Sequence, residues 1–253
     1  MSLLNNLNLD VLKVPLGFIR VCELPLVIIA FASASGWSVS TSYTATSCSK
    51  TFDKFEFGYP FALTDLEVPK NSCVSTTTNL SNVFHQNYKS QAQFFVFTGV
   101  VSFLYILAIL ALYLFKWDLY ENDKRAPMLD CVITAVLALF WFAGSIAWAA
   151  ALTGIKSNTD QDELIQKNLE KIDKACVQHS CKFKDGWGYA GLTISVIAGF
   201  GVLICFIGNT WFVYKETEWF KNRHPPPPVG GYPGEGAPYT PDGAQAGSTE
   251  AYK

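Results

Sequence analysis

The uncharged stretch FFVFTGVVSFLYILAILALYLF, residues 94–115, decides the class of this protein. A helix needs roughly 20 apolar residues to cross a hydrocarbon core about 30 Å thick. Two further runs, Cys131 to Leu152 and Trp187 to Tyr214, are equally free of charged residues. Because lipid offers the backbone no hydrogen-bond partner, each run is predicted to cross the membrane as an α-helix.

The composition supports a lipid environment. Half of the 253 residues are hydrophobic, only 16% are charged, and the mean hydropathy is +0.20. Soluble domains carry about 25% charged residues. The net charge of -2 gives no indication of a nucleic-acid partner.

A fourth span is predicted before these three. Leu24 to Val39 is uncharged and reaches membrane thickness if its helix begins near Leu16. Arg20 and Glu23 are three residues apart, so they can pair on one face of that helix. The alternative is a cleaved signal peptide, with Ala32-Ser33-Ala34 as the cleavage site. An uncleaved helix gives four spans with both termini on one side.

The predicted fold class is therefore an all-α membrane protein, a four-transmembrane-helix bundle over residues 18–217. Its parts are spans near 18–38, 94–115, 129–152 and 189–214, loops 39–93 and 153–188, connector 116–128, N-terminus 1–17 and tail 218–253.

Lysine and arginine counts on the two sides nearly balance, so other features predict the orientation. Asn79-Leu80-Ser81 is a glycosylation sequon, which is used only on the lumenal side. Each long loop also holds two cysteines, as expected for disulfides in an oxidising lumen: Cys48 and Cys73 in the first, Cys176 and Cys181 in the second. The loops are therefore predicted to be lumenal and both termini cytoplasmic.

Four loop cysteines allow three pairings. Pairing within each loop is favoured because each loop then closes independently, and a Cys48–Cys73 bridge would contribute about 3–4 kcal/mol in the chain-entropy model. A zinc site is the alternative, since His179 lies between the second pair. Four well-spaced ligands are missing from the sequence there, so no metal is predicted.

Small residues recur at spacing four in the predicted spans and let helix backbones approach closely. The sequence does not distinguish packing within one bundle from an oligomer or partner surface. These residues are Gly191, Ser195 and Gly199, then Ala143, Ala147 and Ala151, then Ala32 and Gly36.

Catalytic patterns are missing from the sequence. The three histidines, His85, His179 and His224, lie outside the spans, and phosphate-binding and nucleophile-elbow motifs are lacking. The cores of the last three spans hold no ionisable residue, unlike those of most transporters. We expect no enzyme, no cofactor and no ion-selective pore within one chain. A pore formed between several chains remains an alternative.

The chain changes character from His224 onward. A proline run at 225–228 is followed by repeated glycine and proline, which predicts a disordered cytoplasmic tail. It can serve as an adaptor-binding segment or as a solvated linker. Tyr232, Tyr239 and Tyr252 are candidate phosphorylation sites, because they are exposed in flexible chain.

Several motifs carry a resemblance to a known family. They are Val14-Pro15-Leu16-Gly17-Phe18, Phe57-Gly58-Tyr59-Pro60-Phe61, Pro127-Met128-Leu129-Asp130, Ser145-Ile146-Ala147-Trp148-Ala149 and the stretch GNTWFVYKET at 208–217. Across residues 14–217 the chain resembles the synaptophysin family of MARVEL-type tetraspan vesicle membrane proteins. Synaptogyrins share the architecture, but these motifs fit synaptophysins better.

The resemblance implies a role that composition does not show. Members of the family are glycoproteins of synaptic and other small secretory vesicles, form homo-oligomers, bind the vesicle SNARE synaptobrevin and associate with cholesterol. They sort that SNARE and support vesicle formation, exocytosis and recycling. The positions matching the family's lumenal disulfides and glycosylation site are Cys48, Cys73, Cys176, Cys181 and Asn79. The alternatives are an oligomeric channel and a junctional or myelin-type MARVEL scaffold.

The tail departs from the family pattern. Family tails commonly carry many Tyr-Gly-Pro-Gln-like repeats, and this short tail has none. The resemblance therefore does not extend to tail-dependent regulation.

Overall fold

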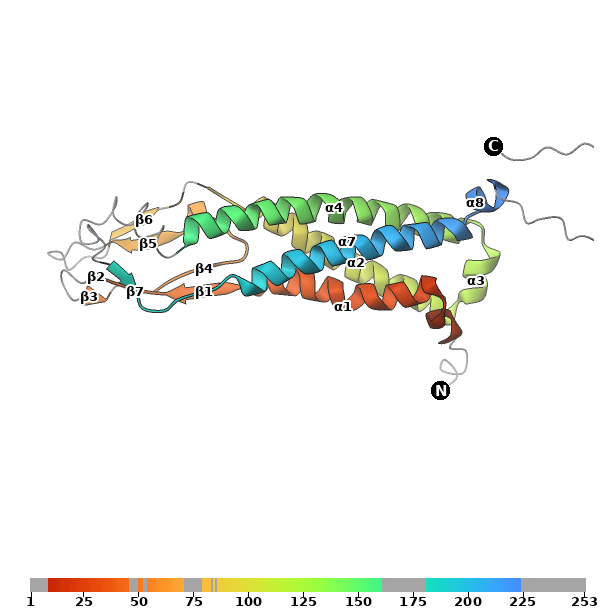
Figure 1. Cartoon of the computed structure of the whole chain (residues 1–253), viewed down its shortest axis with the longest axis horizontal. Coiled ribbons are helices and arrows are strands. Elements are labelled where there is room, and N and C mark those ends of the chain that lie inside the picture. The colour runs from red at the N-terminus through yellow and green to blue at the C-terminus, as the bar shows by residue number, and fades with distance from the viewer. Residues whose placement is uncertain are drawn as a thin grey trace, which may run out of the picture.

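The computed structural model describes residues 9–45, 50–51, 54–70, 79–82, 84, 86–160 and 181–223. Four of the helices in these segments are long and apolar enough to cross a membrane: α1 Pro15–Ser35, α2 Lys89–Phe115, α4 Arg125–Thr159 and α7 Ala190–Glu216. They run lengthwise as one elongated bundle (Figure 1). The prediction of a four-span helical membrane protein is confirmed at this level.

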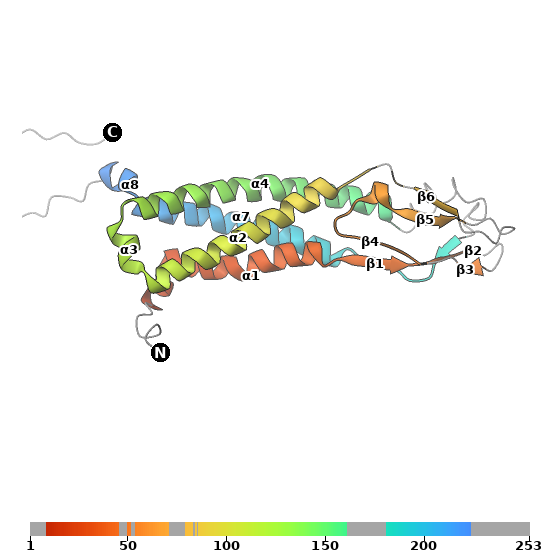
Figure 2. The same cartoon turned by 180° about the vertical axis from the view of Figure 1, so that it is seen from behind.

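The four helices pack in a ring of neighbours. α1 contacts α7 and α2, and α4 also contacts α7 and α2. α2 crosses the bundle diagonally, so it changes its distance from α1 and α4 along its length (Figure 2). α4 begins before and ends after the predicted span 129–152, because its helical pattern continues into polar residues at both ends.

Short helical segments gather at one end of the bundle, which we name the connector end. They are the 3-10 helix η2 Leu9–Lys13, α3 Trp117–Asn122 and α8 Glu218–Arg223. The start of α1 and the finish of α7 both lie at this end (Figure 1). Pro15 suits the first turn of α1, where its missing N–H costs no helical hydrogen bond.

The opposite end, here the loop end, carries short strands. The elements are β1 Ser38–Thr41, β2 Tyr43–Ala45, β3 Lys50–Thr51, β4 Phe55–Gly58, the 3-10 helix η3 Leu63–Asp65, β5 Glu67–Lys70, β6 Asn79–Asn82 and β7 Cys181–Phe183. They form three antiparallel sheets with the orders β1-β4, β3-β2-β7 and β5-β6. The all-α prediction is therefore too strict, since the protein is mostly helical with strands in its long loops.

The middle sheet joins the two predicted loops. β2 pairs with β3 of the first loop and with β7 of the second, with Thr44 opposite both Thr51 and Lys182. Backbone hydrogen bonds between loops leave no signal in hydropathy, so the sequence does not predict this pairing. The described strands of the two loops are thus joined by backbone hydrogen bonds at the loop end.

Aromatic side chains fill the loop half of the bundle. The Trp148 ring stacks on Phe95 with centroids 5.8 Å apart and lies 5.4 Å from the Phe61 ring. Trp37 then stacks on both Phe61 and Tyr189, each at 5.8 Å. The indole N–H of Trp148 donates to Ser195 Oγ at 2.8 Å, so this buried donor is satisfied.

The small residues of α7 face this aromatic core. A Cβ built on Gly199 would lie 2.8 Å from Phe95 Cε2 and 3.0 Å from Ser145 Oγ, and one on Gly191 would lie 3.5 Å from Trp37 Cδ1. On α4, Ala151 is buried, Ala147 is half-buried and Ala143 is exposed. The α7 stripe therefore packs inside the bundle, and Ala143 faces outward.

Several predicted positions lie outside the described residues or only partly within them. Cys48, Cys73, Cys176, the three histidines and the tail tyrosines Tyr232, Tyr239 and Tyr252 fall outside. For Cys181 and Asn79 the backbone alone is described, in β7 and β6. The disulfide, glycosylation and phosphorylation assignments stay predictions. Among the described cysteines, Cys22, Cys131 and Cys205 are free thiols.

Candidate functional site

A charged cluster lies buried near the connector end of the bundle. Arg20 and Glu23 of α1 have no exposed surface, and Asp130 of α4 is 3% exposed. Arg20 Nη1 donates to Glu23 Oε2 at 3.0 Å, which is the pair that their spacing of three predicts. Arg20 Nη2 donates to Asp130 Oδ1 at 2.8 Å and so links α1 to α4.

Asp130 accepts hydrogen bonds from three tyrosines. Tyr113 of α2 and Tyr120 of α3 donate to its Oδ2 at 2.5 and 3.0 Å, and Tyr105 of α2 donates to its Oδ1. Hydroxyl donors to a carboxylate make stronger hydrogen bonds than neutral pairs. One carboxylate thus holds two further helices against α4.

Thr134 lies one turn along α4 from Asp130. Its Oγ1 accepts from Arg20 Nη2 at 2.7 Å and donates to Asp130 Oδ1 at 3.1 Å. The hydroxyl therefore serves both partners of the ion pair at once.

α7 joins the cluster through Asn209 and Phe206. The Asn209 amide lies 3.4 Å from Glu23 Oε1, as donor in the assigned orientation. The Arg20 guanidinium lies 5.8 Å from the centre of the Phe206 ring and 5.1 Å from that of Tyr105, within the range of cation–π attraction. All four long helices meet at these side chains.

Apolar residues close the connector end beneath the cluster. Val11 of η2 is buried in this layer, which consists of Val11, Leu16, Ile109, Tyr113, Tyr120, Cys131 and Val213. A Cβ on Gly17 would collide with the Val11 carbonyl oxygen, so glycine is required there for η2 to fold back against α1. The layer separates the charges from water at this end.

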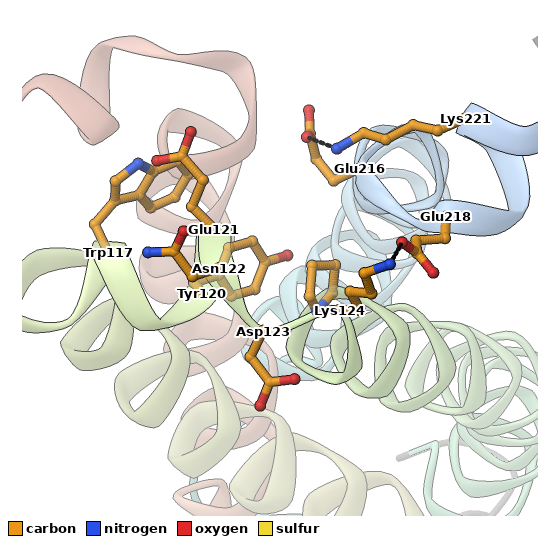
Figure 3. A pocket seen from close by; sticks show the side chains of 10 residues that line it. Trp117, Tyr120, Glu121, Asn122, Asp123, Lys124, Glu216, Glu218 and Lys221 are labelled. Carbon is orange, nitrogen blue, oxygen red and sulfur yellow. Dashed lines mark ion pairs between the residues drawn. The ribbon is translucent and has the colours of Figure 1, made fainter. Parts of the chain in front are cut away.

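An open cleft lies on the outer side of that layer. It has a volume of about 320 Å³ and is lined by Trp117, Tyr120, Glu121, Asn122, Asp123, Lys124, Pro127, Glu216, Glu218 and Lys221. Figure 3 shows two ion pairs at its rim: Lys124 Nζ to Glu218 Oε1 at 2.7 Å and Lys221 Nζ to Glu216 Oε2 at 3.5 Å. The four carboxylates outnumber the two ammonium groups, so the cleft has acidic character.

Tyr120 connects the cleft to the buried cluster. It lines the cleft, and its hydroxyl donates to Asp130. Burial, then the nearby Asp130 carboxylate, raises the pKa of the Tyr120 phenol, so this group stays a neutral hydrogen-bond donor across the physiological range.

The family model of the membrane-associating domain, MARVEL, matches residues 11–212. The match runs from η2 to the last turns of α7, across all four apolar helices. The chain belongs to the MARVEL family. It is an integral membrane protein of the scaffold type that this domain suggests.

The sequence predicts only part of the site in this MARVEL domain. The spacing of Arg20 and Glu23 predicts their pairing, whereas Asp130 stands out in the sequence only as part of the motif at 127–130. A usable signal existed: Tyr105 and Tyr113 lie eight residues apart in α2, so they share one helix face. A carboxylate just inside an apolar helix indicates a buried partner of this kind.

The hydrogen bonds and ion pairs of the cluster hold the helices of the MARVEL domain together. Its groups satisfy one another within hydrogen-bond distance. Lipid-facing positions are instead apolar, with Leu139, Ile197 and Ile204 largely exposed.

Proposed function

We propose that this MARVEL protein is a non-enzymatic scaffold of synaptic and secretory vesicle membranes. It binds the vesicle SNARE synaptobrevin, sorts it into vesicles and supports vesicle formation, exocytosis and recycling. The observation that carries the proposal is a bundle whose buried charged groups pair with one another while its outer faces stay apolar. Such a protein can act through its outer surfaces.

The proposed assignment to the synaptophysin family, within the MARVEL proteins, rests on that family's motifs. One of them is the stretch GNTWFVYKET at 208–217. By analogy with that family, the connector end is cytoplasmic, and the loop end, where β6 contains Asn79, is lumenal. Homo-oligomers multiply weak helix contacts, each polar contact being worth about 1–2 kcal/mol in lipid. Cholesterol is the expected lipid partner, and no cofactor takes part.

Co-purification tests the proposal. The full chain is captured from vesicle membranes in mild detergent and probed for synaptobrevin and for its plasma-membrane SNARE partners. Recovery of synaptobrevin without those partners is the expected result, because sorting precedes SNARE assembly. Failure to recover it while the oligomers persist contradicts the SNARE role.

An Arg20→Met chain is the matched control for this capture. It keeps every lipid-facing residue but loses the cation of the buried cluster. Loss of synaptobrevin with this variant shows that recovery depends on the folded bundle. Conductance of the reconstituted wild-type protein distinguishes the scaffold from an oligomeric channel.

A further inference from the structure

The buried cluster contains two carboxyl groups and one cation. Among the described residues, Arg20, Glu23 and Asp130 are the formally charged side chains with essentially no exposed surface. With all three ionised, the bundle would hold one uncompensated negative charge in a low-dielectric interior. A net charge in such a place is disfavoured, and a proton on one carboxyl would remove it.

Both carboxylate oxygens of Asp130 are surrounded by hydrogen-bond donors. Its Oδ1 accepts from Arg20, Tyr105 and Thr134, and its Oδ2 accepts from Tyr113 and Tyr120. A carboxylate accepts on both oxygens and donates nothing, which matches this set of donors. A proton on Asp130 would have to be accommodated among groups that already donate toward it.

Glu23 has surroundings that fit a neutral acid. Its Oε2 accepts from Arg20 at 3.0 Å, whereas its Oε1 meets the Asn209 amide at the longer distance of 3.4 Å. The oxygen and nitrogen of a side-chain amide are interchangeable by a flip. In the flipped orientation the Asn209 oxygen accepts the proton of a neutral Glu23.

We propose that the bundle binds one proton on Glu23, between Arg20 and Asn209, at neutral pH. The contact between Glu23 of α1 and Asn209 of α7 is then a neutral hydrogen bond, and Arg20 is left to neutralise Asp130. The other titratable groups around this site are Cys22 of α1, Tyr105 and Tyr113 of α2, Asp130 of α4 and Cys205 of α7. None of them supplies a second cation.

The proposal fixes how stability depends on pH. A glutamate in the unfolded chain releases its proton near pH 4.3, whereas the folded bundle keeps it. The folded state then binds more protons than the unfolded state, so stability falls as pH rises above that value until Glu23 ionises.

Infrared spectroscopy of the full chain in lipid nanodiscs tests the proton directly. Glutamate labelled with ¹³C at the side-chain carboxyl is compared with unlabelled protein at neutral pH. One protonated-carboxyl band that shifts with the label is expected, and it should vanish in Glu23→Gln and persist in the exposed control Glu216→Gln. No such band in the wild-type protein, or a band that shifts only with labelled aspartate, overturns the proposal.

Thermal unfolding across pH gives a second measurement. Glu23→Gln keeps the shape of the neutral acid, so it should fold and should lose much of the wild-type decline in melting temperature as pH rises above about 4.3. Cys22→Ser and Cys205→Ser, which remove the neighbouring thiols, should retain that decline. A folded Glu23→Gln protein with the full wild-type decline overturns the proposal, and should the variant not fold, the labelled wild-type spectra decide.

Discussion

The two halves of the bundle are held by different means. Near the connector end, the side chains around Arg20, Glu23 and Asp130 form ion pairs and hydrogen bonds that reach every long helix. In the loop half, Trp148 and Phe95 stack, and a glycine of α7 lets the backbone approach them. One half therefore depends on charge and the other on shape.

This difference matters more in lipid than in water. Lipid tails are as apolar as leucine, so burying apolar surface between helices contributes little to their association. A unique arrangement needs either polar groups that must find their partners or surfaces that fit only one way. The bundle has partnered polar groups near the connector end and closely fitting aromatic surfaces in the loop half.

Arg20→Met should produce the largest effect. It leaves the Asp130 carboxylate buried without its cation, and removal of one partner of a buried pair costs about 3–5 kcal/mol. The expected result is a large fall in the melting temperature of the protein in detergent. Size-exclusion chromatography after heating measures the fraction that is still folded.

Arg125→Met is the matched control, because Arg125 is exposed at the start of α4. Similar melting of the two variants would mean that the charged cluster does not stabilise the connector half.

Gly199→Leu tests the shape-dependent half and should rank second. The added side chain meets Phe95, which cannot yield easily because it is stacked on Trp148. Overpacking of this kind costs about 1–3 kcal/mol, so the melting temperature should fall by less than in Arg20→Met. Ala143→Leu on the exposed face of α4 should leave bundle stability unchanged. Unchanged assembly and expression of Gly199→Leu would contradict the close packing of α7.

The four spans were predictable because lipid imposes a simple requirement. A charge-free run as long as 94–115 has to form a helix, whatever its neighbours are. The Arg20–Glu23 pair was predictable for a similar reason, since a spacing of three fixes it within one helix. Local rules were sufficient for both features.

Long-range partners were not predictable in this way. Asp130 lies 110 residues from Arg20, and the helix faces that meet are set by packing rather than by spacing. The pairing of β2 with β7 depends likewise on how the two loops fold over the bundle. The direction of the α7 stripe became clear only from the position of Phe95.

Glu218→Gln should have the smallest effect, and it compares burial with distance. The Lys124–Glu218 pair is as close as Arg20–Asp130, at 2.7 against 2.8 Å, but its side chains are 75% and 41% exposed. Water and salt screen such a pair, so the melting temperature should not change measurably.

The exposed pair should still be visible in the titration of Lys124. Its hydrogen bond to Glu218 raises the pKa of the Lys124 ammonium, so the interaction is present at neutral pH and is lost as pH rises through that raised value. In Glu218→Gln the pKa should fall toward the ordinary lysine value, as followed by NMR of ¹⁵N-labelled lysine. A loss of stability in Glu218→Gln as large as in Arg20→Met would show that proximity of charges, rather than their burial, holds the connector half together.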